Sequence, residues 1–131
     1  MNKKIKFIEV KSELAAGTRG ASLGIGAVKT ASLNKKNDFF KHYESIEVEV
    51  YNEKLWDDEF KYPNAKRIDG VYQVLKNVSD AVSSEIKNSY PVVLAGDHST
   101  AAGTICGIKA ANPDKRLGVV WIDAHADLHT P

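Results

Sequence analysis

The chain has 131 residues, enough for one domain with a hydrophobic core. Apolar residues make up 43% and charged residues 27%, as in ordinary globular proteins. Lys and Arg together number 18 against 17 acids, so the overall charge favours neither nucleic-acid nor membrane binding. The single Cys106 excludes an internal disulfide and fits a reducing compartment, which predicts a cytoplasmic protein. We identify neither a signal peptide nor a stretch approaching the roughly 20 apolar residues of a membrane span.

Apolar periodicity predicts the elements of the first two thirds of the chain. Residues 5–10 predict a strand, residues 12–24 a loop of glycine and small residues, and residues 23–33 a short helix. Residues 46–50 alternate with glutamates and predict a strand with one wet face, near a sheet edge. Residues 66–88 predict the clearest helix, because their apolar residues form one stripe at helical spacing.

The last third predicts a strand, a helix and another strand. Residues 92–95 form a short apolar run, and residues 99–111 predict a helix of small residues that packs close to the sheet. Residues 117–123 are apolar on both faces, which is typical of a central parallel strand. The alternation of strands and helices predicts an α/β fold with three αβα layers and a mainly parallel sheet.

Two carboxylates and an imidazole follow the last apolar run, as Asp123, His125 and Asp127. In a straight strand, side chains two residues apart share a face, but Asp123 and Asp127 would lie roughly 13 Å apart. One ion with ligands at about 2.0–2.2 Å cannot bind both across that distance. If all three side chains are ligands, the strand must end near Asp123 and the chain must curl around the metal.

A second acid and imidazole, Asp97 and His98, follow the apolar run of residues 92–95. Gly96 allows a tight turn, and Ser99 is placed to cap the helix that follows. A strand, a helix and a parallel strand form a βαβ unit, in which the carboxyl ends of the strands lie along one side of the sheet. His98 is therefore expected to converge with the cluster that begins at Asp123.

The segments Gly96-Asp-His-Ser and Asp123-Ala-His-Ala-Asp together resemble the ureohydrolase superfamily of arginases, agmatinases and formimidoylglutamases. The resemblance is closest to arginases and implies a centre of two Mn²⁺ ions. It implies that His98, Asp123, His125 and Asp127 bind the metals, with Asp123 bridging. It also implies that Asp127 orients the attacking hydroxide, and that Asp97 supports His98 or its turn from behind.

The resemblance also shows two departures. The family carries a further acidic pair downstream, and these residues end at Pro131 before it. We therefore expect residues 1–131 to be the N-terminal portion of a single arginase-like domain, inactive alone and homo-oligomeric when full length. The second departure is His129, where arginases usually have an asparagine that holds the amino acid end of the substrate. We expect His129 to contact the substrate there.

The function that the resemblance implies is hydrolysis of linear amidines or guanidines by a metal-bridging hydroxide. Arginine, giving ornithine and urea, is the leading substrate, and agmatinase or formimidoylglutamase activity stays open. A zinc-dependent deacetylase-like enzyme is a second alternative, because that class shares the architecture and an Asp-x-His site. A non-catalytic fragment is the third. Carboxylate and imidazole ligands without thiolate favour manganese, iron or cobalt over structural zinc.

Overall fold

The computed structural model describes residues 3–57 and 61–125. In this part of the chain one sheet contains three parallel strands, β1 (Lys4–Val10), β2 (Glu44–Glu47) and β3 (Ser89–Ala95). The order is β2-β1-β3, so β1 is central and β2 lies at an edge, as its alternating glutamates predicted.

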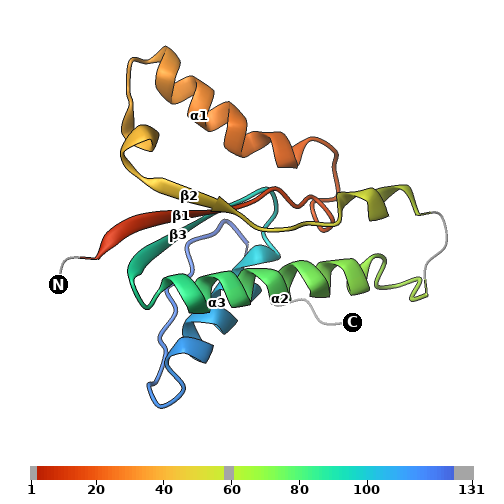
Figure 1. The fold of residues 1–131 in the computed structure, drawn as a ribbon. Helices are drawn as coiled ribbons and strands as arrows, with labels where there is room; N and C mark the ends of the chain where they lie inside the picture. The colour runs from red at the N-terminus through yellow and green to blue at the C-terminus, as the bar shows by residue number, and fades with distance from the viewer. Residues whose placement is uncertain (1–2, 58–60, 126–131) are drawn as a thin grey trace.

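Helices cover both faces of this sheet. The helix α1 (Gly24–Asn34) lies on one side, while α2 (Ile68–Glu85) and α3 (Thr100–Ala111) lie on the other (Figure 1). Short 3₁₀ turns precede α1, β2 and α2. The predicted three-layer α/β architecture is confirmed, with helix bounds within a few residues of those expected.

The main core lies between β1 and α2. Ile8 and Val10 point from alternate positions of β1 toward the valines at every fourth position of α2, and all are essentially inaccessible. The α2 residues are Val74, Val78 and Val82. Full burial of such a side chain stabilises the fold by about 1.5–3 kcal/mol, so this stripe fixes the position of α2.

The small residues of α3 pack against α2 rather than against the sheet, which corrects the sequence-based expectation. A Cβ added at Gly103 would lie 2.7 Å from the carbonyl oxygen of Leu75. One added at Gly107 would lie 2.6 Å from that of Ser79. The two glycines therefore allow backbone-to-backbone contact between the helices.

On the opposite face an ion pair and an aromatic cluster hold α1 and its neighbouring turn. Lys29 of α1 pairs with Glu9, a β1 side chain that is only 7% exposed. Phe7 packs edge-on against Phe39 and Tyr43, with ring centroids 6.0 and 5.9 Å away. Phe7 and Glu9 therefore bind the α1 layer, while Ile8 and Val10 form the core with α2.

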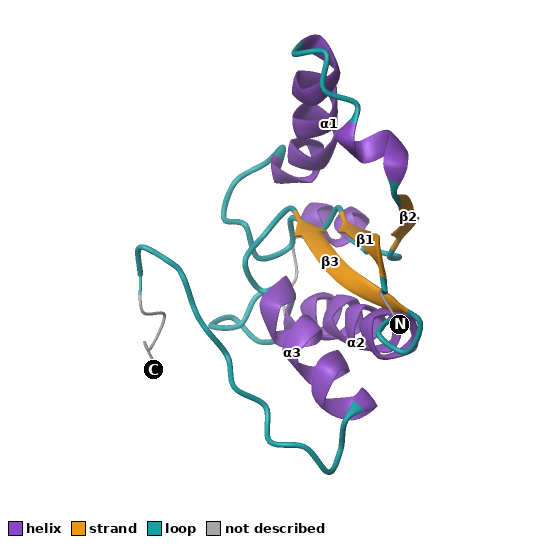
Figure 2. Ribbon diagram, turned by 90° about the vertical axis from the view of Figure 1, so that its left-hand side faces the viewer, coloured by secondary structure: helices purple, strands orange, loops and turns teal. Residues whose placement is uncertain are grey.

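The prediction of a strand at residues 117–123 is wrong. Residues 112–125 follow α3 as an irregular segment that pairs with no strand in the described part of the chain, and Figure 2 shows it running outside the body of the fold. Val120 is 88% exposed and Ile122 94%. An apolar run forms a strand only where a neighbouring backbone supplies hydrogen-bond partners, and no described strand lies beside this one.

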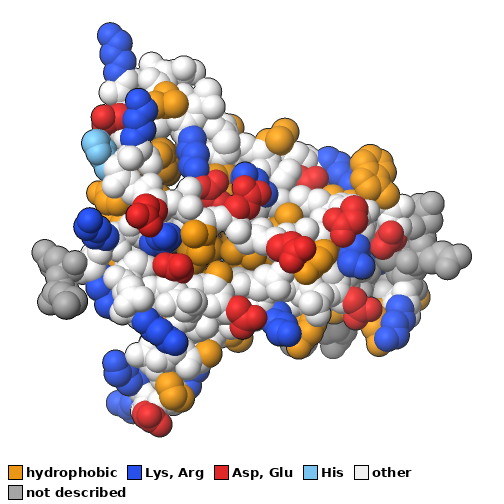
Figure 3. All heavy atoms as spheres, viewed as in Figure 1, with side chains coloured by type: hydrophobic (Ala, Val, Ile, Leu, Met, Phe, Trp, Pro, Cys, Tyr) orange, Lys and Arg blue, Asp and Glu red, His pale blue; other side chains and the backbone are white. Residues whose placement is uncertain are grey.

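The surface shows no large field of one sign on the face drawn in Figure 3, where acidic and basic side chains are interspersed. Among the described helices, none combines the length and apolar character that a membrane crossing requires.

Candidate functional site

The turn after β3 lies at the carboxyl edge of the sheet, beside the loop that follows β1. The amide of Gly96 donates to the carbonyl of Val10 over 2.9 Å and so extends the pairing of the two strands. A Cβ added at Gly96 would lie 2.3 Å from the carbonyl oxygen of Ser12. Glycine is thus required here for close approach of two loops.

Asp97 points away from solvent and accepts hydrogen bonds from both of these loops. Its Oδ1 accepts from the amide and hydroxyl of Ser99, at 3.1 and 2.5 Å. Its Oδ2 accepts from the hydroxyl of Ser12 at 3.4 Å and the amide of Ala15 at 3.3 Å. Ser99 stands at the N-cap position of α3 but makes no side-chain cap, because its hydroxyl binds Asp97.

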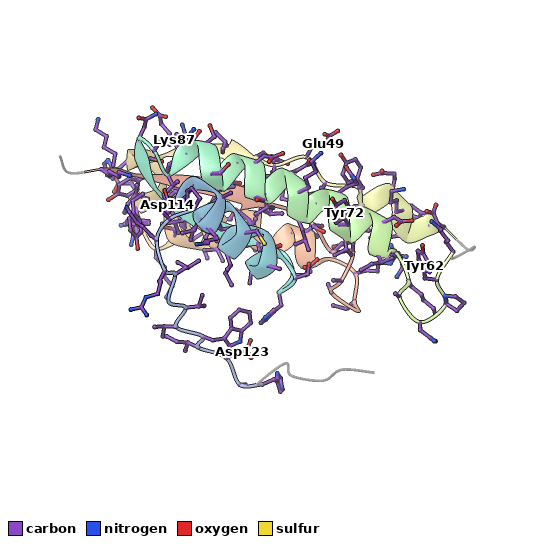
Figure 4. All side chains as sticks on the ribbon, turned by 90° about the horizontal axis from the view of Figure 1, so that it is seen from below. Glu49, Tyr62, Tyr72, Lys87, Asp114 and Asp123 are labelled. Atoms are coloured by element: carbon purple, nitrogen blue, oxygen red, sulfur yellow. The ribbon has the colours of Figure 1, made fainter. Side chains whose placement is uncertain are left out.

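His98 points outward from the same turn and meets Asp123. The distance from His98 Nδ1 to Asp123 Oδ2 is 3.1 Å. The indole of Trp121 lies beside the His98 ring, with centroids 4.8 Å apart. His98 remains 48% exposed, so this pair lies at an open surface (Figure 4 labels Asp123 on the segment outside the helices).

The chain turns sharply after Asp123, as the metal-ligand hypothesis required. The amide of His125 donates to Asp123 Oδ1 over 2.9 Å, which bends the backbone within two residues. The Nδ1 atom of His125 lies 3.7 Å from the same oxygen. The two carboxylate oxygens of Asp123 thus face different imidazoles.

These contacts favour the ionised form of Asp123. The hydrogen bond from the His125 amide is the main cause that lowers the pKa of the Asp123 carboxyl below its ordinary value. Partial burial opposes this change in pKa, and positive charge on His98 and His125 reinforces it. An ionised carboxylate between two imidazoles is a suitable place for a cation.

An apolar hollow of about 440 Å³ adjoins His98. It lies between β3, α3 and the segment after α3, and its walls include Val93, Ile105 and Trp121. The candidate site therefore has a polar rim at Asp123 and an apolar side along α3.

The sequence-predicted residues divide into three groups. His98, Asp123 and His125 lie at one edge, as expected, and Asp97 lies behind His98. Asp127 and His129 fall outside the described residues. Within those residues, no three His, Cys, Asp or Glu side chains gather closely enough to hold a metal ion.

The donor atoms nevertheless suit a divalent first-row ion. Two ligands at about 2.1 Å from one ion and at right angles lie about 3.0 Å apart. The separation of His98 Nδ1 from Asp123 Oδ2, 3.1 Å, matches this spacing, and the mixed nitrogen and carboxylate donors match the chemistry. The residues present therefore fit part of a metal centre.

Sequence reasoning missed Ser12 and Trp121. Ser12 follows the first predicted strand, so the convergence argument used for Asp97 applied equally to it. The strand expected at residues 117–123 includes Trp121, whose ring lies instead beside His98 in an irregular segment.

Comparisons with known proteins find similarity to arginases along nearly the whole chain. The model of the Arginase family matches residues 3–131. The arginase of Bacillus subtilis is 32% identical over 133 aligned residues, covering 99% of this chain and 43% of that protein. The arginase of Brevibacillus brevis is 33% identical, with the same shares covered. The chain therefore spans less than half the length of these relatives.

Solved structures agree with this result. The arginase of Bacillus caldovelox superposes with a TM-score of 0.77 at 28% identity, covering 98% of this chain and 43% of that one. The Entamoeba histolytica arginase, solved with L-ornithine, shares the fold with a TM-score of 0.78 at 24% identity, covering 98% and 44%. The family match, the relatives and the shared fold together show that this chain belongs to the arginase family.

Proposed function

We propose that the protein is a ureohydrolase that uses two Mn²⁺ ions to hydrolyse arginine to ornithine and urea. In this proposal residues 1–131 form the N-terminal portion of a single arginase-like domain, and the full-length protein is a cytoplasmic homo-oligomer. The observation that supports it best is Asp123, whose two oxygens face the Nδ1 atoms of His98 and His125 at 3.1 and 3.7 Å. Membership of the arginase family supports the reaction class.

Each proposed ligand has a defined task. His98 and His125 would hold the ions through imidazole nitrogens, and Asp123 would hold them through its carboxylate. The ions, when bound, would supply a water acidic enough to act as a nucleophile near neutral pH. Asp127 would complete the ligand set and accept a hydrogen bond from the attacking water, while Asp97 would keep the His98 turn in place.

His129 is proposed to contact the end of the substrate remote from the guanidinium group. An imidazole offers at most two donors, in a geometry unlike that of an asparagine amide. Agmatine or formimidoylglutamate therefore remains an alternative substrate, because these molecules differ from arginine at that end.

The test is metal analysis and turnover of the full-length protein. We expect two manganese ions per chain and release of urea from arginine. His98→Ala and Asp123→Asn should each remove metal and activity, while the matched surface variant His42→Ala should retain both. One zinc ion per chain with hydrolysis of an acetyl-lysine peptide would contradict the proposal and favour the deacetylase class.

The choice of substrate is tested at His129. We expect His129→Asn to change the ratio of kcat/KM for arginine to that for agmatine by about three- to tenfold, the usual consequence of losing or gaining one hydrogen bond. An unchanged ratio would show that His129 does not contact the substrate.

A further inference from the structure

We propose that Ser12 is a positioning residue for His98, acting through the buried carboxylate of Asp97. The inference rests on the proposed role of His98 as a metal ligand. It assigns to the loop after β1 the task of holding the turn after β3 in a conformation that binds metal.

Asp97 divides its hydrogen bonds between its own turn and the loop after β1. Its Oδ1 binds Ser99 of its own turn, whereas its Oδ2 reaches across to Ser12 and Ala15 of the neighbouring loop. Asp97 is only 9% exposed and immediately precedes His98 in the chain. A shift of Asp97 relative to the β1 loop would therefore move His98 as well.

Ser12 is 2% exposed, and its hydroxyl makes two hydrogen bonds. It donates to Asp97 Oδ2 over 3.4 Å and accepts from the amide of Leu14 over 3.4 Å. Removal of this hydroxyl deprives the buried carboxylate of a donor and leaves a buried amide without an acceptor. Neither group can reach water without movement of the loop, because both are buried.

The loop after β1 is itself held by several hydrogen bonds. The carboxylate of Glu13 accepts from the amides of Gly20 and Ser22, at 2.9 and 3.0 Å. The amide of Glu13 donates to the side chain of Asn52 over 3.0 Å. The loop is thus fixed from within and from the turn after β2, so it can act as a rigid support for Asp97.

The experiment is a double-mutant cycle on manganese binding by this chain. Mn²⁺ is titrated into the wild type, Ser12→Ala, Asp97→Asn and the double variant, with free Mn²⁺ measured by electron paramagnetic resonance. Ser12→Ala should weaken binding by about three- to tenfold, the usual consequence of losing one hydrogen bond. In the Asp97→Asn background the same change should have at most about a twofold effect, because Ser12 acts through Asp97. Ser83→Ala, at an exposed hydroxyl bonded to Asp80 on α2, is the matched control and should bind as the wild type does.

His98→Ala separates failure of this inference from failure of the proposed function. If His98→Ala binds Mn²⁺ as tightly as the wild type, His98 is not a ligand and both proposals fall. If His98→Ala loses binding but Ser12→Ala does not, the ligand assignment stands and the positioning role is overturned. An equal effect of Ser12→Ala in both backgrounds also overturns it.

Hydrogen exchange of the wild type provides a measurement that needs no variant. If the Asp97 turn strengthens Mn²⁺ binding, Mn²⁺ binding must stabilise that turn by the same factor. Saturating Mn²⁺ should therefore slow exchange of the Ala15 amide, which donates to Asp97, by about three- to tenfold. The amide of Asn88, bonded to Glu85 at the opposite edge of the sheet, should not change. Equal exchange of Ala15 with and without Mn²⁺ would overturn the inference even if Ser12→Ala failed to fold.

Discussion

The two acid and imidazole motifs follow apolar runs of the same kind, yet only one of these runs is a strand. The run that ends at Ala95 pairs with β1 along the whole of β3, and the motif after it is anchored by the buried Asp97. The run that ends at Ile122 is largely exposed, and the motif after it is held by Asp123. Local sequence is thus sufficient for the turns at both motifs but not for the second strand.

A strand needs backbone partners as well as apolar residues. Each backbone amide and carbonyl in a strand requires a partner, and β1 supplies these partners for one side of β3. No described strand lies beside residues 117–123, so their backbone remains solvated. Asp123 nevertheless contacts His98, although no strand pairing joins their two segments in the described residues.

The largest expected difference between the two regions is in hydrogen exchange. Amides of β3 that donate to β1 should be protected by at least about 10³-fold, since they open only with the core. Amides of residues 117–122 should exchange within about tenfold of unstructured rates. Exchange read by nuclear magnetic resonance checks this, and strong protection of Val120 and Ile122 would show that the segment is paired in solution.

A matched pair of glycine substitutions tests packing in the same two regions. Gly107→Ala should lower the free energy of unfolding by about 2 kcal/mol, because the new methyl group meets the Ser79 carbonyl and Val82. Gly118→Ala should change it by less than about 0.5 kcal/mol, because nothing lies within 4 Å of its added Cβ. Urea denaturation measures both, and equal losses would contradict the contrast.

These comparisons also show how much the sequence could predict. The order of strands and helices predicted the layers, and the helical spacing of apolar residues in 66–88 predicted α2 and its buried face, because burial of one face depends on local spacing. His98 and Asp123 do meet, but the second strand on which that expectation rested is not formed in the described residues. The bond from Ser12 to Asp97 joins residues 85 positions apart, and such distant partners leave no local pattern.

Replacing a carboxylate by an amide has different expected effects in the two regions. Glu9→Gln breaks the largely buried pair with Lys29 and should cost about 1 kcal/mol at pH 7, since Lys29 is partly exposed and its charge is screened. Asp123→Asn, in the exposed segment, should lower the free energy of unfolding by clearly less than Glu9→Gln does. Denaturation of both variants measures the difference, and equal costs would contradict it.

The cost of Glu9→Gln should also depend on pH. Burial alone would raise the pKa of Glu9, but hydrogen bonds from Lys29 and Ser45 lower it below the ordinary value. A lowered pKa in the folded state stabilises the fold above the unfolded pKa, about 4.3, and this contribution disappears as the pH falls through the folded value. The wild type should therefore lose its advantage over Glu9→Gln in acid. An advantage independent of pH would assign the effect to packing instead.

The smallest expected effect is stabilisation of this chain by manganese. The four proposed donors, His98, Asp123, His125 and Asp127, are too few for two ions that each prefer about six ligands. We therefore expect at most one weakly bound Mn²⁺. With a dissociation constant of about 1 mM, binding at 1 mM Mn²⁺ would raise the free energy of unfolding by only about 0.4 kcal/mol. The same ion should slow exchange at residues 117–125 more than in β3, since the Asp123 motif has the least support without it.

No urea should be released from arginine by the 131 residues alone. Calorimetric titration and a urea assay check both points. Two tightly bound ions with turnover would show that these residues contain a complete site.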